Sequence, residues 1–310
     1  MQHQTKAEQP IKIAVVGDVH NQWSADDNEA IAHLGVDLVL FVGDFGNESV
    51  SVVKQVAALE IPKAVILGNH DAFYSATPRG RKKCPYDRHK ENRIKDQLDL
   101  LGKTHVGYSK LDFPDLKLTV VGGRPFSWGG PKWKYWDFYR DWFGVTNMQE
   151  STNRIVEAAN QSAYDTVIFL GHNGPAGLGD RPEDPCGKDW KPIGGDFGDP
   201  DLKEAIGQTQ QMGKTIPLVT FGHMHHQLNH TKERLRKRLD VSREGTVYYN
   251  AAVVPRIVQK LSKKERTFSI VSLQTGIVTE IAIIWVNQQY QTVSEEIIYR
   301  PQPNSLVQSA

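Results

Sequence analysis

Residues 11–20 read IKIAVVGDVH, residues 37–47 read DLVLFVGDFGN, and residues 63–71 read KAVILGNHD. Each stretch starts with a run of apolar residues and continues through a glycine into polar residues. Such continuous apolar runs are typical of strands that are buried on both faces, as in a parallel sheet. Amphipathic segments at 24–35 and 49–60 separate them, so this part of the chain predicts a βαβαβ unit.

The rest of the chain continues with further strand-like runs and with irregular segments. The pattern predicts helices near 150–162 and after Asp199-Pro200, and strands at 116–123, 166–171, 216–222, 245–254, 266–273 and 276–286. We expect the last four strands to form a largely antiparallel second sheet. Polar, aromatic or Gly/Pro-rich segments predict insertions over a site, at 72–112, 124–149 and 173–199. We expect one domain over 1–310, with a polar arm or disordered tail from about residue 287.

Charge and composition narrow the class of protein. The 310 residues include 37 Lys+Arg and 36 Asp+Glu, a net charge of +1, which argues against a protein that coats a polyanion. Cys84 and Cys186 are too few for a disulfide scaffold or a thiolate zinc site, so we expect free thiols in a reducing compartment. No apolar stretch approaches the ~20 residues of a membrane span. We therefore expect a cytoplasmic or plastid-stromal protein without a membrane partner; its oligomeric state stays open.

Five short polar clusters carry the chemistry, in the order GDVH (17–20), GDFGN (43–47), GNHD (68–71), GHNG (171–174) and GHMHH (222–226). Each of them directly follows a predicted strand. Because parallel strands bring their carboxyl ends to one edge of a sheet, we expect the clusters to converge. Carboxylates, imidazoles and an amide oxygen suit divalent Mn, Fe, Zn or Ni better than Ca or Mg, although Mg stays possible.

This ordered set resembles the calcineurin-like metallophosphoesterase superfamily, and the resemblance covers residues 11 to about 251. It implies an α/β fold with two central β-sheets packed as a sandwich and flanked by helices. It also implies two divalent metal ions that share Asp44. Asp18, His20 and His225 complete the first set of ligands, and Asn69, His172 and His223 complete the second. The stretches GHNGPAGLG (171–179) and GGRPFSWGG (122–130) are similar to a branch from cyanobacteria and plastids.

The resemblance further implies phosphoester hydrolysis, in which a hydroxide held between the two metals attacks phosphorus. His70 occupies the GNH position, where an imidazole steadies the phosphate or protonates the leaving oxygen, and Asp71 is a second catalytic candidate. The protein phosphatase branch carries GDxxDRG, but Asn47 and Glu48 stand at its last Asp and Arg positions here. GNHD (68–71) and GHMH (222–225) look more like the phosphodiesterase and nucleotide-hydrolase branches. With the departure at 47–48, they favour a small, nucleotide-like phosphomonoester or phosphodiester over a phosphoprotein as the substrate. The departure leaves Glu48 or Asp71 to support His70.

Two arginines are candidates for the missing phosphate clamp. Arg124 follows a predicted strand in GGRPFS, and Arg181 lies in the third insertion. A guanidinium matches phosphate geometry because it donates two parallel hydrogen bonds.

Two further features allow alternative interpretations. The aromatic residues of 126–143 favour a small local core, and the alternative is a stacking wall beside the metals. Basic stretches at 79–95 and 232–243 are typical of solvated surfaces, but they leave a nucleic-acid partner open. Two alternative functions stay open beside hydrolysis of a small phosphoester. One is a catalytically silent binding scaffold, and the other is a nucleic-acid-processing phosphodiesterase.

Overall fold

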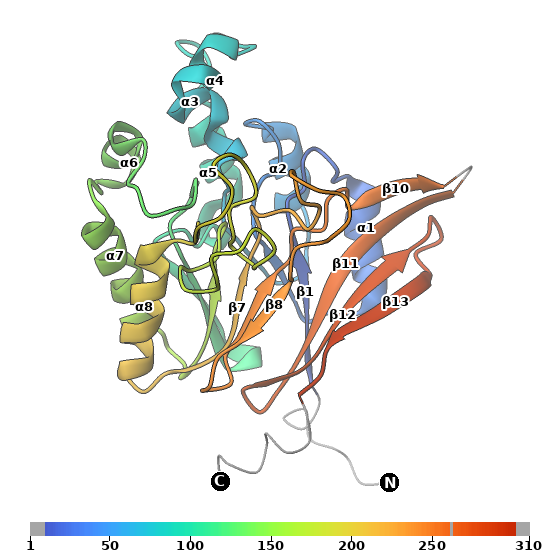
Figure 1. Ribbon diagram of the computed structural model, residues 1–310. Helices are drawn as coiled ribbons and strands as arrows, with labels where there is room; N and C mark the ends of the chain where they lie inside the picture. Colours follow the sequence, from blue (N-terminus) through green and yellow to red (C-terminus); the bar gives the residue numbers. More distant parts are fainter. Residues whose placement is uncertain (1–9, 261–262, 302–310) are drawn as a thin grey trace, which may run out of the picture.

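The computed structural model describes residues 10–260 and 263–301. Two β-sheets lie face to face at its centre, and helices cover the outer face of each sheet (Figure 1). This arrangement confirms the expected α/β sandwich of two sheets flanked by helices.

The first sheet is built around the unit that the opening residues predict. Parallel strands β1 (Ile11–Val16), β2 (Leu38–Phe41) and β3 (Lys63–Val65) are connected by helices α1 (Ala25–Leu34) and α2 (Val50–Ala57). Helix α1 begins after Ser24, whose backbone N–H donates to the Asp27 carboxylate at 2.9 Å. It ends at Gly35, which has the left-handed backbone that glycine adopts without strain.

The same sheet continues with antiparallel strands from the end of the chain. Strand β11 (Lys263–Gln274) pairs with β1, β12 (Ile277–Val286) pairs with β11, and β13 (Thr292–Tyr299) pairs with β12. The short strand β10 (Ile257–Lys260) also pairs with β11. The polar arm expected from about residue 287 is therefore wrong for this part, because residues 292–299 form a paired edge strand. Its exposed, charged side chains explain why the sequence resembles a tail.

The second sheet has parallel strands in its centre and an antiparallel strand on either side. Strands β5 (Leu118–Gly122), β6 (Thr166–Leu170), β7 (Thr215–Phe221) and β9 (Val247–Asn250) are parallel, whereas β4 (Lys110–Phe113) and β8 (Leu239–Val241) are antiparallel to their neighbours. The largely antiparallel second sheet that we expected is thus wrong. Strands β7 and β9 belong to the parallel part of this sheet, and β11 and β12 belong to the first sheet.

Three apolar layers hold the sandwich together. In β1, Ile13 and Val15 pack between the two sheets, while Ala14 and Val16 pack under the helices, as the period of two requires. A third layer lies between the second sheet and helices α7 (Met148–Asn160) and α8 (Pro200–Gln211). Each buried Ile, Leu or Val contributes about 1.5–3 kcal/mol to folding. The layers therefore fix the carboxyl ends of both sheets relative to each other.

The segments expected as insertions differ in what they do. Residues 72–112 contain α3 (Phe73–Ala76) and α4 (Pro78–Lys83), which protrude above the upper end of the sheets in Figure 1, and α5 (Arg93–Leu101), which packs against α2. Residues 124–149 contain α6 (Trp136–Phe143), and 173–199 form a loop. Short 3₁₀ turns complete the structure: η1 (His70–Ala72), η2 (Gly102–Thr104) and η3 (Pro114–Leu116).

The beginning of β1 and the end of β13 lie at the lower end of the sandwich in Figure 1, because Ile11 pairs with Leu273 and Tyr299 pairs with Ile281. The carboxyl ends of β1, β2 and β3 lie at the upper end. None of the helices in the described part of the chain has the length and apolar character that crossing a bilayer requires.

Candidate metal centre

The expected metal ligands come together at the upper end of the two sheets. They lie in the loops that follow β1, β2 and β3 of the first sheet and β6 and β7 of the second: Asp18, His20, Asp44, Asn69, His172, His223 and His225. Because the sheets pack face to face, the loops of both sheets reach one place.

The first group of ligand atoms belongs to Asp18, His20 and His225, and these atoms all lie within 4.8 Å of one another. The two imidazoles face each other, with 3.0 Å between His20 Nε2 and His225 Nε2. On its other side, His20 Nε2 lies 4.0 Å from Asp44 Oδ2. Asp44 therefore borders this group, as a bridging ligand would.

The second group consists of Asp44, His172 and His223, whose ligand atoms also lie within 4.8 Å of one another. His172 Nε2 is 3.3 Å from Asp44 Oδ1. Asn69 Oδ1 completes the group at 2.9 Å from His172 Nε2 and 2.8 Å from His223 Nδ1. The structure thus brings together the residues of both ligand sets that the resemblance implies, and their role as ligands stays a prediction.

The imidazoles are prepared for ligation by their surroundings. His172 Nδ1 donates to the Val42 carbonyl oxygen at 2.7 Å, so the lone pair of Nε2 points at Asn69 and Asp44. Burial lowers the pKa of His225 to about 4, and it also lowers the pKa values of His20 and His223. These rings are neutral at neutral pH, which is the form that binds a metal ion.

The two carboxylates of the site favour the binding of a positively charged ligand. Asp18 and Asp44 are both buried. Burial and the neighbouring carboxylate of Asp44 raise the pKa of Asp18 to about 7. Two buried carboxylates that interact in this way repel each other, and a divalent cation between them would remove the repulsion. The donor set and its electrostatics thus fit a pair of divalent metal ions.

The backbone of the ligand loops is unusual. Asp18, His20, Asp44 and His223 have φ values of 24°, 44°, 54° and 65°, in the left-handed region that side chains other than glycine seldom occupy. Each such residue costs about 1–3 kcal/mol, and such strain clusters at functional sites. Gly68 makes the close approach possible, because a Cβ there would lie 2.3 Å from Asp44 Oδ1.

His70 lies beside the two groups with its side chain 40% exposed, and its Nε2 is 4.0 Å from Asp44 Oδ2. Its ligand atom also lies within 4.8 Å of those of His20 and Asp44, so these three residues form a third close group. His70 Nδ1 is 2.7 Å from Asn47 Oδ1. Since an amide oxygen only accepts, Nδ1 carries the hydrogen and Nε2 faces the centre. Asn47 therefore orients His70 in place of Glu48 or Asp71, the two residues that we expected to do so.

Asp71 and Glu48 serve the scaffold instead. The buried Asp71 carboxylate accepts hydrogen bonds from the backbone N–H groups of Asp44, Phe45 and Gly68, at 2.9, 2.9 and 2.7 Å. Glu48 accepts from the Ser75 backbone at 2.6 Å and from the hydroxyl of Tyr86. The catalytic role expected for Asp71 stays a prediction; in the structure its oxygens hold the loop after β2 against the loop after β3.

The structure places both expected phosphate-binding arginines away from the metal ligands. Arg124 is buried, with ion pairs to Asp199 at 2.8 Å and Asp201 at 3.3 Å, and its guanidinium lies over the Trp133 ring. It ties the aromatic segment to the start of α8. Arg181 is exposed and is not among the residues that line the pocket beside the metal ligands. Neither arginine reaches the centre.

A pocket of about 400 Å³ opens beside the ligands, and residues that the motifs did not reveal form its other wall. Asp44, Asn69, His70, His223, Met224 and His225 of the motifs line it on the metal side. The remaining lining residues, which we call the far wall, are Trp128, Lys134, Asp189, Trp190, Phe197, Asn229 and Arg236. Most of the far wall comes from loops. The course of these loops depends on contacts between residues that are far apart in the sequence. The aromatic content of 126–143 was therefore the one sequence feature that pointed to this wall.

The aromatic segment is mostly a local core. Phe126, Phe138 and Tyr139 are buried, and Trp133 and Phe143 pack against them. Among the aromatic residues of 126–143, Trp128 alone lines the pocket. Most of this segment therefore forms a small local core. Trp128 is its one residue at the pocket, where stacking against a ligand is possible.

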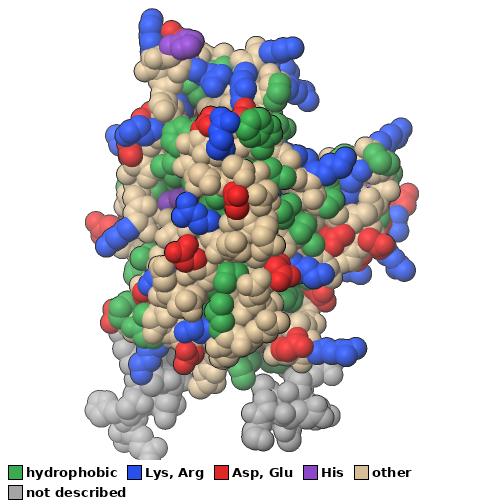
Figure 2. Space-filling model, turned by 90° about the vertical axis from the view of Figure 1, so that its left-hand side faces the viewer, with side chains coloured by type: hydrophobic (Ala, Val, Ile, Leu, Met, Phe, Trp, Pro, Cys, Tyr) green, Lys and Arg blue, Asp and Glu red, His purple; other side chains and the backbone are tan. Residues whose placement is uncertain are grey.

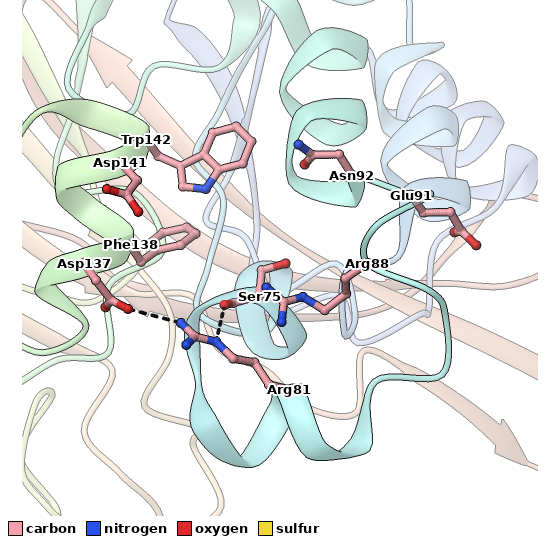
Figure 3. Close-up of a pocket in the computed structure, with 9 residues that line it drawn as sticks. All are labelled: Ser75, Arg81, Arg88, Glu91, Asn92, Asp137, Phe138, Asp141 and Trp142. Carbon is pink, nitrogen blue, oxygen red and sulfur yellow. Dashed lines mark hydrogen bonds and ion pairs between the residues drawn. The ribbon is translucent and has the colours of Figure 1, made fainter.

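A second pocket, of about 190 Å³, lies where segments 72–112 and 124–149 meet. Figure 3 shows Arg81 of α4 reaching both the Ser75 carbonyl and the Asp137 carboxylate of α6, at 3.0 and 3.3 Å. The Arg88 side chain lies near Ser75 in the same view. Charged side chains of both signs line this pocket, and none of the metal ligands does. The pocket therefore lies between the two segments and is separate from the metal centre.

Comparisons with known proteins agree with this geometry. Residues 11–227 match the family model for calcineurin-like phosphoesterases. Similar solved structures include one from Thermus thermophilus, with 11% identity, a TM-score of 0.52, and coverage of 90% of this chain and 99% of that one. They also include a dimetal phosphatase from Danio rerio, with 12% identity, a TM-score of 0.47, and coverage of 94% and 100%.

No curated protein matches the chain. The family match nevertheless spans well over half of the 310 residues and contains all the ligands grouped above. This chain therefore belongs to the calcineurin-like phosphoesterase family.

Proposed function

We propose that the protein is a dinuclear-metal-dependent phosphoesterase that hydrolyses a small phosphomonoester or phosphodiester, with nucleotide-like substrates favoured over phosphoproteins. One observation carries the proposal: ligand atoms from the loops of both sheets converge in two groups that meet at Asp44. Family membership supports phosphoester hydrolysis. The pocket beside the ligands supports a small substrate.

The residues divide the work between ligation and proton transfer. When bound, two divalent ions supply an acidified water and positive charge for the phosphate oxygens, and Mn, Fe, Zn or Ni suit these ligands, with Mg possible. The two oxygens of Asp44 face different groups, so this carboxylate would be a ligand shared by both sets. His70 presents Nε2 to the pocket, and Asn47 keeps the ring in that orientation. When both ring nitrogens carry a hydrogen, Nε2–H would protonate the leaving oxygen and leave a neutral imidazole with its hydrogen on Nδ1.

The alternative of a silent scaffold is disfavoured by the same geometry. The ligand loops keep a strained backbone and a complete donor set, and a binding scaffold needs neither. A silent protein would bind the metal or the ester without turnover.

The test is hydrolysis of p-nitrophenyl phosphate and bis-p-nitrophenyl phosphate by protein stripped of metal and reloaded with Mn²⁺, Mg²⁺, Zn²⁺ or Ni²⁺. We expect turnover with at least one metal, and its loss in Asp44→Asn and His172→Ala with the fold retained by circular dichroism. Full activity in either variant would overturn the proposal. Tight metal binding without turnover of any ester would favour the scaffold.

A second candidate, a nucleic-acid-processing phosphodiesterase, is supported by one surface. Figure 2 shows Lys and Arg side chains gathered on the upper protrusion, which carries α3 and α4 in Figure 1. Arg79, Lys82, Lys83 and Arg88 are exposed there and form no ion pair within the described residues. The stretch 232–243 is different, because Arg234, Lys237 and Arg238 each pair with a carboxylate.

This second candidate predicts binding that weakens steeply with salt. A single-stranded oligonucleotide should lose affinity between ~50 and ~200 mM salt, and Lys82→Gln/Lys83→Gln should reduce the slope by about one to two ions. Binding that is insensitive to salt would exclude it.

A further inference from the structure

The far wall of the active-site pocket carries one cation without an anion. Lys134 lines the pocket, and no carboxylate of the described residues forms an ion pair with it. Its Nζ has only long contacts, to the carbonyl oxygens of Trp128 at 3.5 Å and Gly129 at 3.4 Å, and it lies 4.7 Å from the centre of the Phe197 ring. An ammonium held this way is under-coordinated, which is costly unless an anion arrives.

The surroundings of Lys134 make an anionic partner for its ammonium group still more favourable. Burial and the nearby Arg124 guanidinium lower the pKa of Lys134. The anions nearest to Arg124 are already used, because Asp199 and Asp201 pair with that guanidinium. A ligand phosphate in the pocket would therefore be the natural partner for Lys134.

The other charges of this wall cancel each other. Arg236 donates to four backbone carbonyl oxygens, those of Pro182, Asp184, Gly187 and His225. Its remaining nitrogen is 3.3 Å from Asp189 Oδ2, and Asn229 donates to the same carboxylate. Asp189 is thus neutralised and does not repel an anionic substrate. Lys134 is therefore the charged side chain of the far wall that is available to bind an anionic ligand.

Aromatic surface lies beside this lysine. Trp190 is 38% exposed although it is a large apolar residue, and it lines the pocket. Phe197 supports it edge to face, with 4.8 Å between ring centroids and 81° between the planes. An exposed indole held in place at a pocket wall suits stacking against a planar ring.

We propose that the pocket takes a nucleotide that carries a phosphate in addition to the one hydrolysed, with Lys134 binding the additional phosphate and Trp190 stacking on the base. This inference rests on the proposed phosphoesterase function and names the substrate class of the same site. The scissile phosphate lies at the metal ligands, and the rest of the substrate lies along the loops that contain residues 128–134 and 189–197.

Three substrates separate the two contacts: adenosine 3′,5′-bisphosphate has both groups, AMP lacks the additional phosphate, and ribose 5-phosphate lacks the base as well. In Lys134→Met, we expect kcat/KM for the bisphosphate to fall about tenfold or more while AMP changes much less. Lys134→Arg keeps the charge and should keep the preference. The matched control is Lys132→Met, an exposed lysine of the same loop that does not line the pocket.

The base contact has a separate readout. Trp190→Ala should lower the preference for AMP over ribose 5-phosphate about fivefold or more, and Trp190→Phe should restore it in part. Bisphosphate binding should quench tryptophan fluorescence, and Trp190→Phe should remove that quenching while Trp136→Phe keeps it. Trp136 is the matched control because it is 55% exposed on α6, outside the pocket.

The outcomes distinguish the two levels of the proposal. If the wild type hydrolyses p-nitrophenyl phosphate but Lys134→Met leaves the bisphosphate-to-AMP ratio unchanged, the inference is overturned and the phosphoesterase function stands. If the wild type hydrolyses no ester with any metal, the proposed function itself fails. If fluorescence quenching persists in Trp190→Phe, the assignment of the base to Trp190 is wrong.

Discussion

Asp71 holds three backbone N–H groups that would otherwise be buried without an acceptor. Each unsatisfied buried donor costs about 1–3 kcal/mol, so Asp71→Ala should lower the free energy of unfolding by at least about 3 kcal/mol. Urea unfolding followed by circular dichroism measures this loss.

Asp71→Asn is the control for this prediction, because its amide oxygen can still accept some of these hydrogen bonds. We expect a smaller loss of stability in that variant. An Asp71→Ala protein that unfolds at the wild-type urea concentration but has lost its activity would return Asp71 to a catalytic role.

His105 gives the stability a pH dependence away from the metal ligands. Its buried Nε2 has no hydrogen-bond partner among the residues that the structure describes, and burial lowers the pKa of His105 to about 4. In the unfolded chain the pKa is about 6.5, so between these values the unfolded state binds more protons. The stability that depends on a neutral His105 is therefore fully present above pH ~6.5. It decreases as the pH falls toward ~4, by up to about 1.4 kcal/mol per pH unit.

The comparison with His105→Gln isolates this contribution from the rest of the chain. The stability difference between wild type and variant should be constant above pH ~7 and should shift against the wild type between pH ~6 and ~4.5. Urea unfolding at several pH values measures it. Parallel pH curves for the two proteins would show that His105 is not protonated on unfolding.

At the scale of elements, Arg124 joins the aromatic segment to the start of α8 through Asp199 and Asp201. Removal of one partner from a buried ion pair leaves an uncompensated charge, so Arg124→Met should destabilise the fold by about 3–5 kcal/mol. Thermal and urea unfolding measure the loss. A stable Arg124→Met protein with a raised KM for phosphoesters would support the phosphate clamp that its sequence context suggests.

The opening strands could be predicted because their signal is local. The apolar runs of β1, β2 and β3, with a helix after each of the first two, occur within sixty residues and need no distant partner. The position of β11 could not be predicted in this way. Its pairing with β1, for example Ala14 with Ile270, joins parts of the chain that no local pattern connects.

The same distinction applies to the site. The ligands were found because each follows a strand in a recognisable cluster, and strand ends are fixed by the sheet. Arg124 also follows a strand, but its side chain turns toward Asp199, far along the sequence. Lys134 was not found because its place in the pocket depends on the fold of the loop between β5 and α6.

At the scale of the whole molecule, the centre connects the two sheets, so bound metal should stabilise the entire sandwich. Metal at about 100 times its dissociation constant adds about 2.7 kcal/mol to the unfolding free energy. We expect the melting temperature to fall on treatment with EDTA and to recover with Mn²⁺ or Zn²⁺. Asp44→Asn should respond much less. Equal melting temperatures of wild type with and without metal would contradict binding at these ligands.

The beginning of β1 and the end of β13 lie at the opposite end of the sandwich from the pocket (Figure 1). An affinity tag or a surface linker attached beyond either strand would therefore face the support, while the pocket faces the solution. The protein can be immobilised through either end for binding measurements, and both orientations should give the same association rate for a small phosphate ester.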